Sequence, residues 1–186
     1  MLDYDKEAER YDASRGGEPR AAAAAQAVLG LLPDGTRRLL DVACGTGIVT
    51  RRLATGRDGL RVTGVDLAPA MARQAAARLP GTVVLADSRR LPFREGRFDA
   101  VSSVWLLHLA PTAEDVRAIV GECARMLRPW PCPVKRDSPA GSRAWSRAYD
   151  STSAAASRAA RHGREAMTAS MSLPTLCAAA LSTVVT

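Results

Sequence analysis

The stretch that decides the fold is residues 37–47, RRLLDVACGTG. Its first part is typical of a short buried strand, and two glycines, Gly45 and Gly47, follow that strand closely. Glycines at this point let the backbone turn tightly and let a ligand approach where a Cβ atom would collide. The stretch therefore predicts a strand, then a loop open to a ligand, then a helix over residues 47–55.

Outward from this stretch, short apolar runs alternate with helix-forming ones. Pro69 and Thr112 mark the first turn and the N-cap of two helices. The alternation predicts an α/β fold with a Rossmann-like, doubly wound parallel sheet and helices on both faces. Further strands are expected at residues 61–67, 82–87 and 98–107, and further helices at residues 19–32, 69–79 and 112–127.

Three parts of the 186-residue chain differ in composition. Residues 1–37 are expected to form an N-terminal helical cap and residues 38–129 the α/β core. Residues 130–186 are rich in Ala, Ser and Arg and hold no Ile or Phe, which predicts disorder or a loosely attached helix. The shift is what a frameshifted high-GC gene would give, so we hypothesise that the C-terminal strands of the sheet are missing or replaced. Strand 98–107 would then be an exposed edge.

The charge of the chain does not indicate a nucleic-acid partner. The net charge is +7, but residues 130–186 contribute 7 basic against 3 acidic side chains, so more than half of the excess lies there. The arginines between residues 89 and 97 are interpreted as a solvated loop and not as a nucleic-acid site.

A membrane-spanning protein, a secreted protein and a metal site are also disfavoured. No apolar run reaches membrane-spanning length, and the first ten residues are too charged for a signal peptide, so we expect a cytoplasmic protein. The four cysteines lack C-x-x-C spacing and have no His or acidic partner at the spacing of metal ligands, so no metal site is expected. The sequence does not indicate an oligomeric state.

Acidic residues end three of the predicted strands, where an open parallel sheet binds its ligands. Asp66 lies nineteen residues after Gly47, the spacing at which a carboxylate accepts hydrogen bonds from both hydroxyls of a ribose. Asp87, followed by Ser88, places an acceptor where an adenine amino group could lie. Asp41, just before the glycines, would repel pyrophosphate and suits a cation such as the ammonium of an amino acid.

Residues Tyr4 to Pro129 resemble the class I S-adenosylmethionine-dependent methyltransferases of the small-molecule type. The resemblance is carried by AERYDASRGG, LLDVACGTGIVTRRL, VTGVDLAPAM, ADSRRLPFREGRFDAVSSVWLLHL and CARMLRP. It implies S-adenosylmethionine as the cofactor and a small-molecule methyl acceptor as the partner. Its implied contacts are Asp41, Ala43, Gly45 and Gly47 at the methionine end, Asp66 at the ribose, Leu67 and Met71 beside the adenine, Asp87 and Ser88 at the adenine edge, Ser103 or Val104 facing the methyl donor, and Tyr11 and Arg15 closing over it.

The expected activity is transfer of a methyl group to an O, N or C nucleophile, chiefly by positioning the reactants. His108, just after the fourth apolar run, is a candidate general base, or else a polar residue at a loop edge. Two alternatives stay open: a catalytically inactive remnant of such an enzyme, and an NAD(P)-dependent oxidoreductase. Against the latter stand Asp41 and Thr50, which occupies the third glycine position of a dinucleotide-binding loop.

Overall fold

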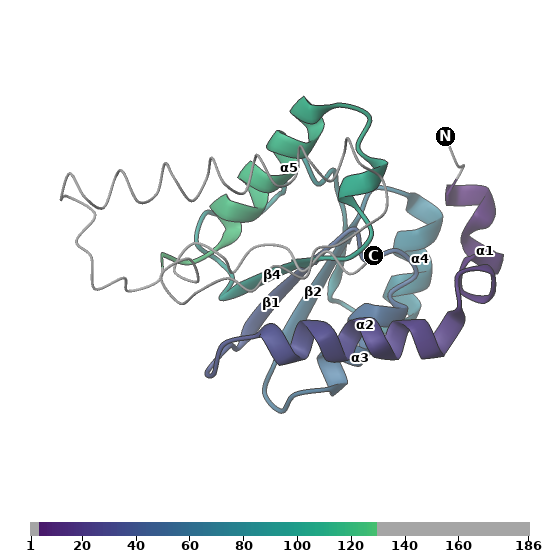
Figure 1. The fold of residues 1–186 in the computed structure, drawn as a ribbon, viewed down its shortest axis with the longest axis horizontal. Helices are drawn as coiled ribbons and strands as arrows, with labels where there is room; N and C mark the ends of the chain where they lie inside the picture. The colour runs from purple at the N-terminus through teal and green to yellow at the C-terminus, as the bar shows by residue number, and fades with distance from the viewer. Residues whose placement is uncertain (1–3, 130–186) are drawn as a thin grey trace.

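The structure is a computed structural model that describes residues 4–129. The expectations for residues 130–186, including their disorder and the replaced strands, lie outside the described residues. The elements are α1 (Tyr4–Ser14), α2 (Gly17–Leu31), β1 (Arg38–Val42), α3 (Ile48–Thr55), β2 (Arg61–Asp66), α4 (Pro69–Arg78), β3 (Val83–Leu85), β4 (Ala100–Ser103), the short 3-10 helix η1 (Leu107–Leu109) and α5 (Ala113–Met126) (Figure 1).

The described strands form one parallel sheet in the order β3-β2-β1-β4, which confirms the predicted fold class. In this order the chain builds outward from β1 to β3 and then crosses back to place β4 on the other side of β1. The strand order therefore reverses between β1 and β4, and ligands bind open sheets outside the carboxyl ends at such a point.

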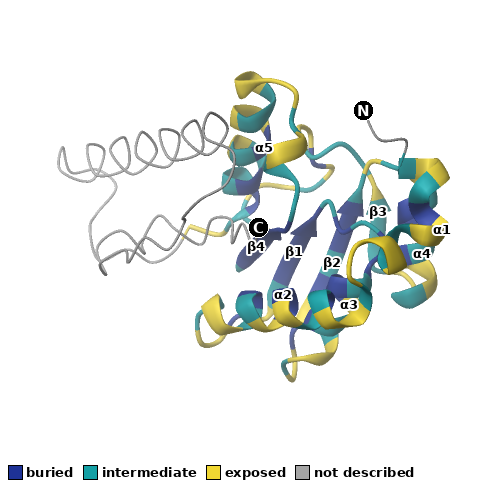
Figure 2. Cartoon of the chain, turned by 45° about the vertical axis from the view of Figure 1, so that its right-hand side comes forward, coloured by how far each residue is buried: buried dark blue, intermediate teal, exposed yellow. Residues whose placement is uncertain are grey.

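Helices cover both faces of the sheet, as the alternation predicts. On one face α2 and α3 pack on Leu39, Val62 and Ala100, and on the other α5 packs on Leu40 and Val101. Figure 2 shows the buried residues concentrated along the strands between these helices. Alternate strand residues point to opposite faces, so a strand buried on both sides is apolar almost throughout.

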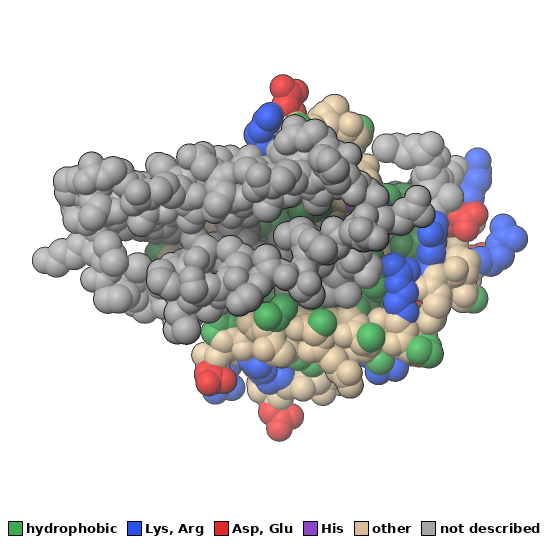
Figure 3. Space-filling view, in the orientation of Figure 1, with side chains coloured by type: hydrophobic (Ala, Val, Ile, Leu, Met, Phe, Trp, Pro, Cys, Tyr) green, Lys and Arg blue, Asp and Glu red, His purple; other side chains and the backbone are tan. Residues whose placement is uncertain are grey.

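The small side chains of α2 let it lie close to the sheet and to α3. Ala21, Ala24 and Ala25 are each at most 3% exposed. Figure 3 shows isolated hydrophobic side chains, and no broad apolar patch, along the visible surface of this helix. The alanine run therefore serves packing, in place of large aromatic side chains.

Two predicted strands are shorter in the structure. The expected strand 98–107 is limited to Ala100–Ser103, because Trp105 takes a left-handed backbone conformation (φ 60°) and η1 follows. The expected strand 82–87 is limited to Val83–Leu85. Thr112 caps α5 as predicted, since its side chain accepts a hydrogen bond from the Asp115 amide.

The chain leaving α5 begins to pair beside β4. Leu127 forms a parallel bridge with Phe98, the Phe98 amide donates to Met126 O at 3.0 Å, and the Arg128 amide donates to Phe98 O at 2.8 Å. Within the described residues this pairing is a single bridge.

The core predicts that replacing either of two leucines by alanine has a different effect on the free energy of unfolding. Leu53 of α3 is 0% exposed, whereas Leu31 at the end of α2 is 64% exposed. We expect Leu53→Ala to lower the free energy of unfolding by about 2–5 kcal/mol through lost burial and a residual cavity. Leu31→Ala is the matched control and should change it by less than about 0.5 kcal/mol. Equal effects in urea unfolding would contradict this placement of the core.

Candidate functional site

The loop after β1 turns through left-handed backbone at three residues: Ala43 (φ 59°), Gly45 (φ 57°) and Gly47 (φ 78°). The two glycines serve different purposes. A Cβ atom added to Gly45 would meet nothing within 4 Å, whereas one added to Gly47 would lie 2.8 Å from the Cα atom of Ala75 in α4. Gly45 thus leaves open space at the sheet edge, and Gly47 permits close packing of α4. A left-handed alanine is uncommon and is held there by its surroundings.

Asp66, at the end of β2, holds this loop. Its Oδ2 atom accepts from the Gly45 amide at 2.7 Å, and its Oδ1 atom accepts from the Ala68 amide at 2.9 Å. Burial raises its pKa, and these backbone hydrogen bonds act in the opposite direction. A carboxylate has about four acceptor sites, so two amide donors leave capacity for hydroxyl donors of a ligand.

Asp41 lies beneath the loop with both carboxylate oxygens occupied. It is 2% exposed, and it accepts from Thr50 Oγ1 at 2.6 Å and from Ser102 Oγ at 2.8 Å. The carboxylate thereby joins β1, α3 and β4. Burial raises its pKa to about 6, against the lowering effect of the two hydroxyl groups. The described geometry makes Asp41 a support of the loop, and its contact with a ligand ammonium stays a prediction.

The raised pKa of Asp41 predicts a pH dependence of stability. Between an ordinary unfolded value near 3.8 and the folded value of about 6, the folded state keeps a proton that the unfolded state releases. The resulting stabilisation is present below the unfolded value and is lost as pH rises through the folded one. We therefore expect the free energy of unfolding of Asp41→Asn, minus that of the wild type, to rise by about 2 kcal/mol between pH 4 and 7.

The measurement is urea unfolding of both proteins across that pH range. Subtracting the wild type removes the contributions of the other carboxyl groups that both chains share. A difference that does not change with pH would contradict the assigned environment of Asp41.

Beyond β2 and β3 the site becomes apolar and then acidic. Leu67 and Leu85 are 61% and 56% exposed, and Leu85 pairs with Asp66 in the sheet, so the ends of these strands present apolar surface. Met71, predicted beside the adenine with Leu67, is only 2% exposed and contributes to the interior. An exposed leucine at the end of a strand offers apolar surface to the face of a planar ring.

Asp87, with its neighbour Ser88 partly buried, follows β3 as predicted. The Arg89 side chain donates to both Asp87 oxygens, at 2.7–3.1 Å, and to Asp115 of α5 at 2.8 Å. The Arg89 hydrogen bonds lower the pKa of Asp87, so it is an ionised acceptor at neutral pH. Arg89 thereby ties the end of β3 to the start of α5, a role that no pattern of residues around it predicts.

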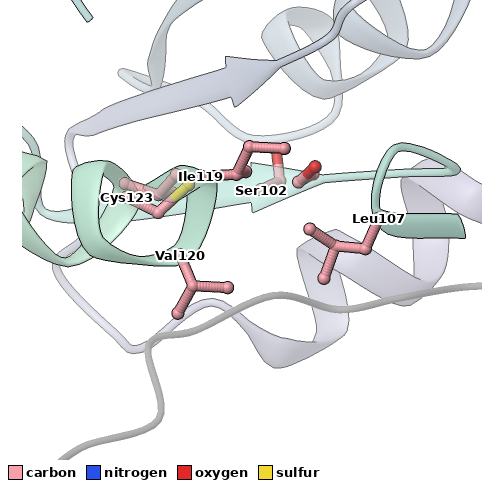
Figure 4. Close-up of a pocket in the computed structure, with 7 residues that line it drawn as sticks. Ser102, Leu107, Ile119, Val120 and Cys123 are labelled. Atoms are coloured by element: carbon pink, nitrogen blue, oxygen red, sulfur yellow. The ribbon is translucent and has the colours of Figure 1, made fainter. Parts of the chain in front are cut away.

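The end of β4 carries two buried polar atoms, Ser103 Oγ and Trp105 Nε1, that have no hydrogen-bond partner among the described residues. Ser103 is paired with Val42 in the sheet and so lies beside the glycine loop. It also borders a narrow slot between β4 and α5 that is lined by Ser102, Leu107, Ile119, Val120 and Cys123 among others (Figure 4). His108 is exposed in η1, and its role as a base stays a prediction.

Tyr11 and Arg15 lie at the end of α1 and in the turn after it, with the Arg15 guanidinium 5.7 Å from the Tyr11 ring centroid. The neighbouring residue Asp12 was not predicted, yet it contacts the glycine loop: Thr46 Oγ1 donates to Asp12 Oδ1 at 2.6 Å. Arg78 of α4 donates to Asp12 Oδ2 at 2.6 Å. The spacing of the acids in α1 was the available signal for Asp12, whereas nothing in the sequence distinguishes Arg78.

The cysteines of the core pack as small apolar residues. Cys44 and Cys123 are free and buried, and burial raises the pKa of both thiols. Between residues 4 and 129, no three His, Cys, Asp or Glu side chains gather as a possible metal site. Over the same residues, no helix has both the length and the apolar character needed to cross a membrane.

Comparison with known proteins agrees with this geometry. Residues 40–130 match a family described as a methyltransferase domain. The chain is 40% identical over 93 residues to a malonyl-[acyl-carrier protein] O-methyltransferase of Geobacter sulfurreducens, covering 46% of this chain and 35% of that protein. It is 37% identical over 103 residues to a ubiquinone biosynthesis O-methyltransferase of Xanthomonas oryzae pv. oryzae, covering 50% and 39%. The chain thus spans less than two fifths of each relative.

The chain is also similar in three dimensions to a solved methyltransferase structure. The chain is similar to S-adenosylmethionine-bound CalS10, an amino pentose methyltransferase from Micromonospora echinaspora, with a TM-score of 0.51 and 35% identity. The similarity covers 60% of this chain and 47% of that one.

Proposed function

The chain belongs, through residues 40–130, to the class I S-adenosylmethionine-dependent methyltransferases, and on this premise we propose that it methylates a small molecule. S-adenosylmethionine would lie across the carboxyl ends of β1, β2 and β3. The observation that carries the proposal is the open space at Gly45, next to an Asp66 carboxylate with acceptor capacity to spare. The free thiols of Cys44 and Cys123 support a reducing compartment, and we propose the cytoplasm.

The residues at this edge fit the cofactor's parts. The Asp66 carboxylate would accept from the ribose hydroxyls, and the exposed Leu67 side chain would lie against the adenine. Asp87, kept ionised by Arg89, would accept from the adenine amino group. Ser103 Oγ, buried without a partner among the described residues, would face the methionine end. A pyrophosphate on the glycine loop would instead lie above the buried Asp41 carboxylate, and this charge disfavours a dinucleotide.

S-adenosylmethionine, when bound, supplies a methyl group that its sulfonium has already made electrophilic. The chain's own residues therefore hold and orient the reactants more than they activate them. The Asp41 carboxylate fixes β1 against α3 and β4, and the Asp66 carboxylate fixes the loop on which the methionine end would rest. Water excluded from this edge would strengthen the same polar contacts.

The test is calorimetric binding of S-adenosylhomocysteine, with NAD as the comparison ligand. Gly45→Ala places a methyl group in the proposed site and should weaken binding by at least about tenfold, a loss of about 1.4 kcal/mol. Gly35→Ala is the matched control, because Gly35 also has a positive φ (80°) and open space but lies in the turn before β1. It should leave binding unchanged.

Binding of NAD in preference to S-adenosylhomocysteine would overturn the proposal, as would equal loss of affinity in the two glycine variants. Acceptors can then be screened with methyl-labelled S-adenosylmethionine. The relatives suggest a malonyl thioester carboxylate, a ring hydroxyl of a quinone precursor and an amino pentose as the first classes to try. Label transferred to any of them would establish the activity, and no transfer to any small molecule would favour the inactive remnant.

A further inference from the structure

We propose that Asp12 is the residue that positions α1 against the cofactor loop, so that cofactor binding and the docking of α1 support each other. This inference rests on the proposed function. It concerns residues 4–14, which lie outside the segment that matches the methyltransferase domain family. Three sets of contacts hold this segment: at Asp12, at the start of α1 and in the turn that follows it.

Asp12 joins three elements through its two carboxylate oxygens. Oδ1 accepts from the hydroxyl of Thr46, the residue between the two loop glycines, and Oδ2 accepts from Arg78 of α4. Arg78 also donates to the backbone oxygen of Thr46 at 2.7 Å. Thr46 is 2% exposed, so its hydroxyl and carbonyl are held inside a closed triangle of α1, loop and α4.

The triangle is better protected from water than an ordinary surface ion pair. The Asp12 and Arg78 side chains are 21% and 32% exposed, whereas the Glu18 and Arg51 side chains, which pair between α2 and α3, are 49% and 46% exposed. Because less solvent surrounds the Asp12–Arg78 pair, the attraction between its charges is screened less and contributes more to holding α1 in place. The Asp12 contact is therefore the firmer of the two.

Asp5 fastens the start of α1 to α4. The first residues of α4 lack a side-chain cap, since Ala68 is the N-cap and Pro69 has no amide hydrogen. The exposed amide of the next residue, Ala70, donates to Asp5 Oδ1 at 2.7 Å. Asp5 and Asp12 are seven residues apart, two helical turns, and so lie on one face of α1. Figures 1 and 2 show α1 alongside α4, as this pair of contacts requires.

Next to this acidic face lie the two tyrosines of α1. Tyr4 and Tyr11 are also seven residues apart, and their ring centroids are 6.0 Å apart. Burial and, to a smaller extent, the neighbouring Tyr11 and the Asp66 carboxylate raise the pKa of Tyr4. Asp5 and Asp12 thus hold in place the helix that carries this pair of tyrosines.

The end of α1 is fastened on the β4 side. Arg20 of α2 donates to the backbone oxygen of Arg15 at 3.1 Å, and its guanidinium lies 3.7 Å from the centroid of the Trp105 ring. Trp105 follows β4 in a left-handed conformation. The segment from α1 into α2 is thus tied to the loop, to α4 and to the end of β4.

These ties make the position of α1 and the shape of the loop interdependent. Because Asp12 holds Thr46, a ligand that rests on Gly45 favours the loop conformation to which α1 is bound. Coupling of this kind is reciprocal. The cofactor should favour the docked position of α1 by the same factor by which the docked α1 increases the affinity for the cofactor. A residue that only stabilised the fold would show no such dependence on the ligand.

The test uses the full chain and S-adenosylhomocysteine, with Asp12→Asn as the variant and Glu18→Gln as the matched control. Asp12→Asn keeps the size of the side chain but loses the charge and one acceptor oxygen. We expect it to weaken binding about tenfold. We also expect that the ligand slows amide hydrogen exchange in residues 4–14 of the wild type and of Glu18→Gln, and does so far less in Asp12→Asn.

A second pair of variants keeps the proposal testable if Asp12→Asn fails to fold. Thr46→Val removes the hydroxyl at constant volume and should weaken binding, whereas Thr46→Ser keeps the hydroxyl and should bind like the wild type. Adding Asp12→Asn to Thr46→Val should cost less than the two separate losses combined, because both break the same contact.

The outcomes separate the two proposals. A wild-type chain that binds S-adenosylhomocysteine, with Asp12→Asn binding equally well, would overturn this inference and leave the proposed function standing. Exchange in α1 that is the same with and without ligand would do the same. A wild-type chain that does not bind S-adenosylhomocysteine would overturn both.

Discussion

The hydrogen bond from the Gly45 amide to the Asp66 carboxylate is the contact on which the site depends. It fixes the loop after β1 to the end of β2. This loop lies beside the β1–β4 pair, where the strand order reverses. Two other carboxylates hold the same loop: Asp41 from beneath, through Thr50 and Ser102, and Asp12 from α1, through Thr46. Three acids around one short loop explain why its left-handed residues, including Ala43, are stable there.

Most of the fold could be predicted from the sequence because local and tertiary signals agree. The apolar runs are short, the helices between them begin with Pro69 or Thr112, and parallel strands then follow from the connections. The length of β4 could not be predicted, because residues 104–107 continue its apolar pattern. The strand ends where Trp105 leaves extended backbone, and that conformation depends on packing against α2, which no local pattern reveals.

The site was predictable only in part, for a similar reason. Strand-end acids such as Asp66 and Asp87 follow from spacing, because parallel strands bring their carboxyl ends together. Sequence could not show that Asp41 is buried and hydrogen-bonded to two hydroxyl groups, or that Gly47 serves packing while Gly45 stays open. Contacts made across long separations, such as Asp12 with Arg78 and Arg89 with Asp115, depend on the folded geometry of three or more elements.

We expect one ligand to lie across the carboxyl ends of β1, β2 and β3. The direct measurement is a titration of the 15N-labelled chain with S-adenosylhomocysteine, followed by the amide chemical shifts of assigned residues. The largest shifts should occur at residues 43–47, at Leu67 and at Ser88. Shifts confined to the slot between β4 and α5, or no saturable shifts at all, would contradict it.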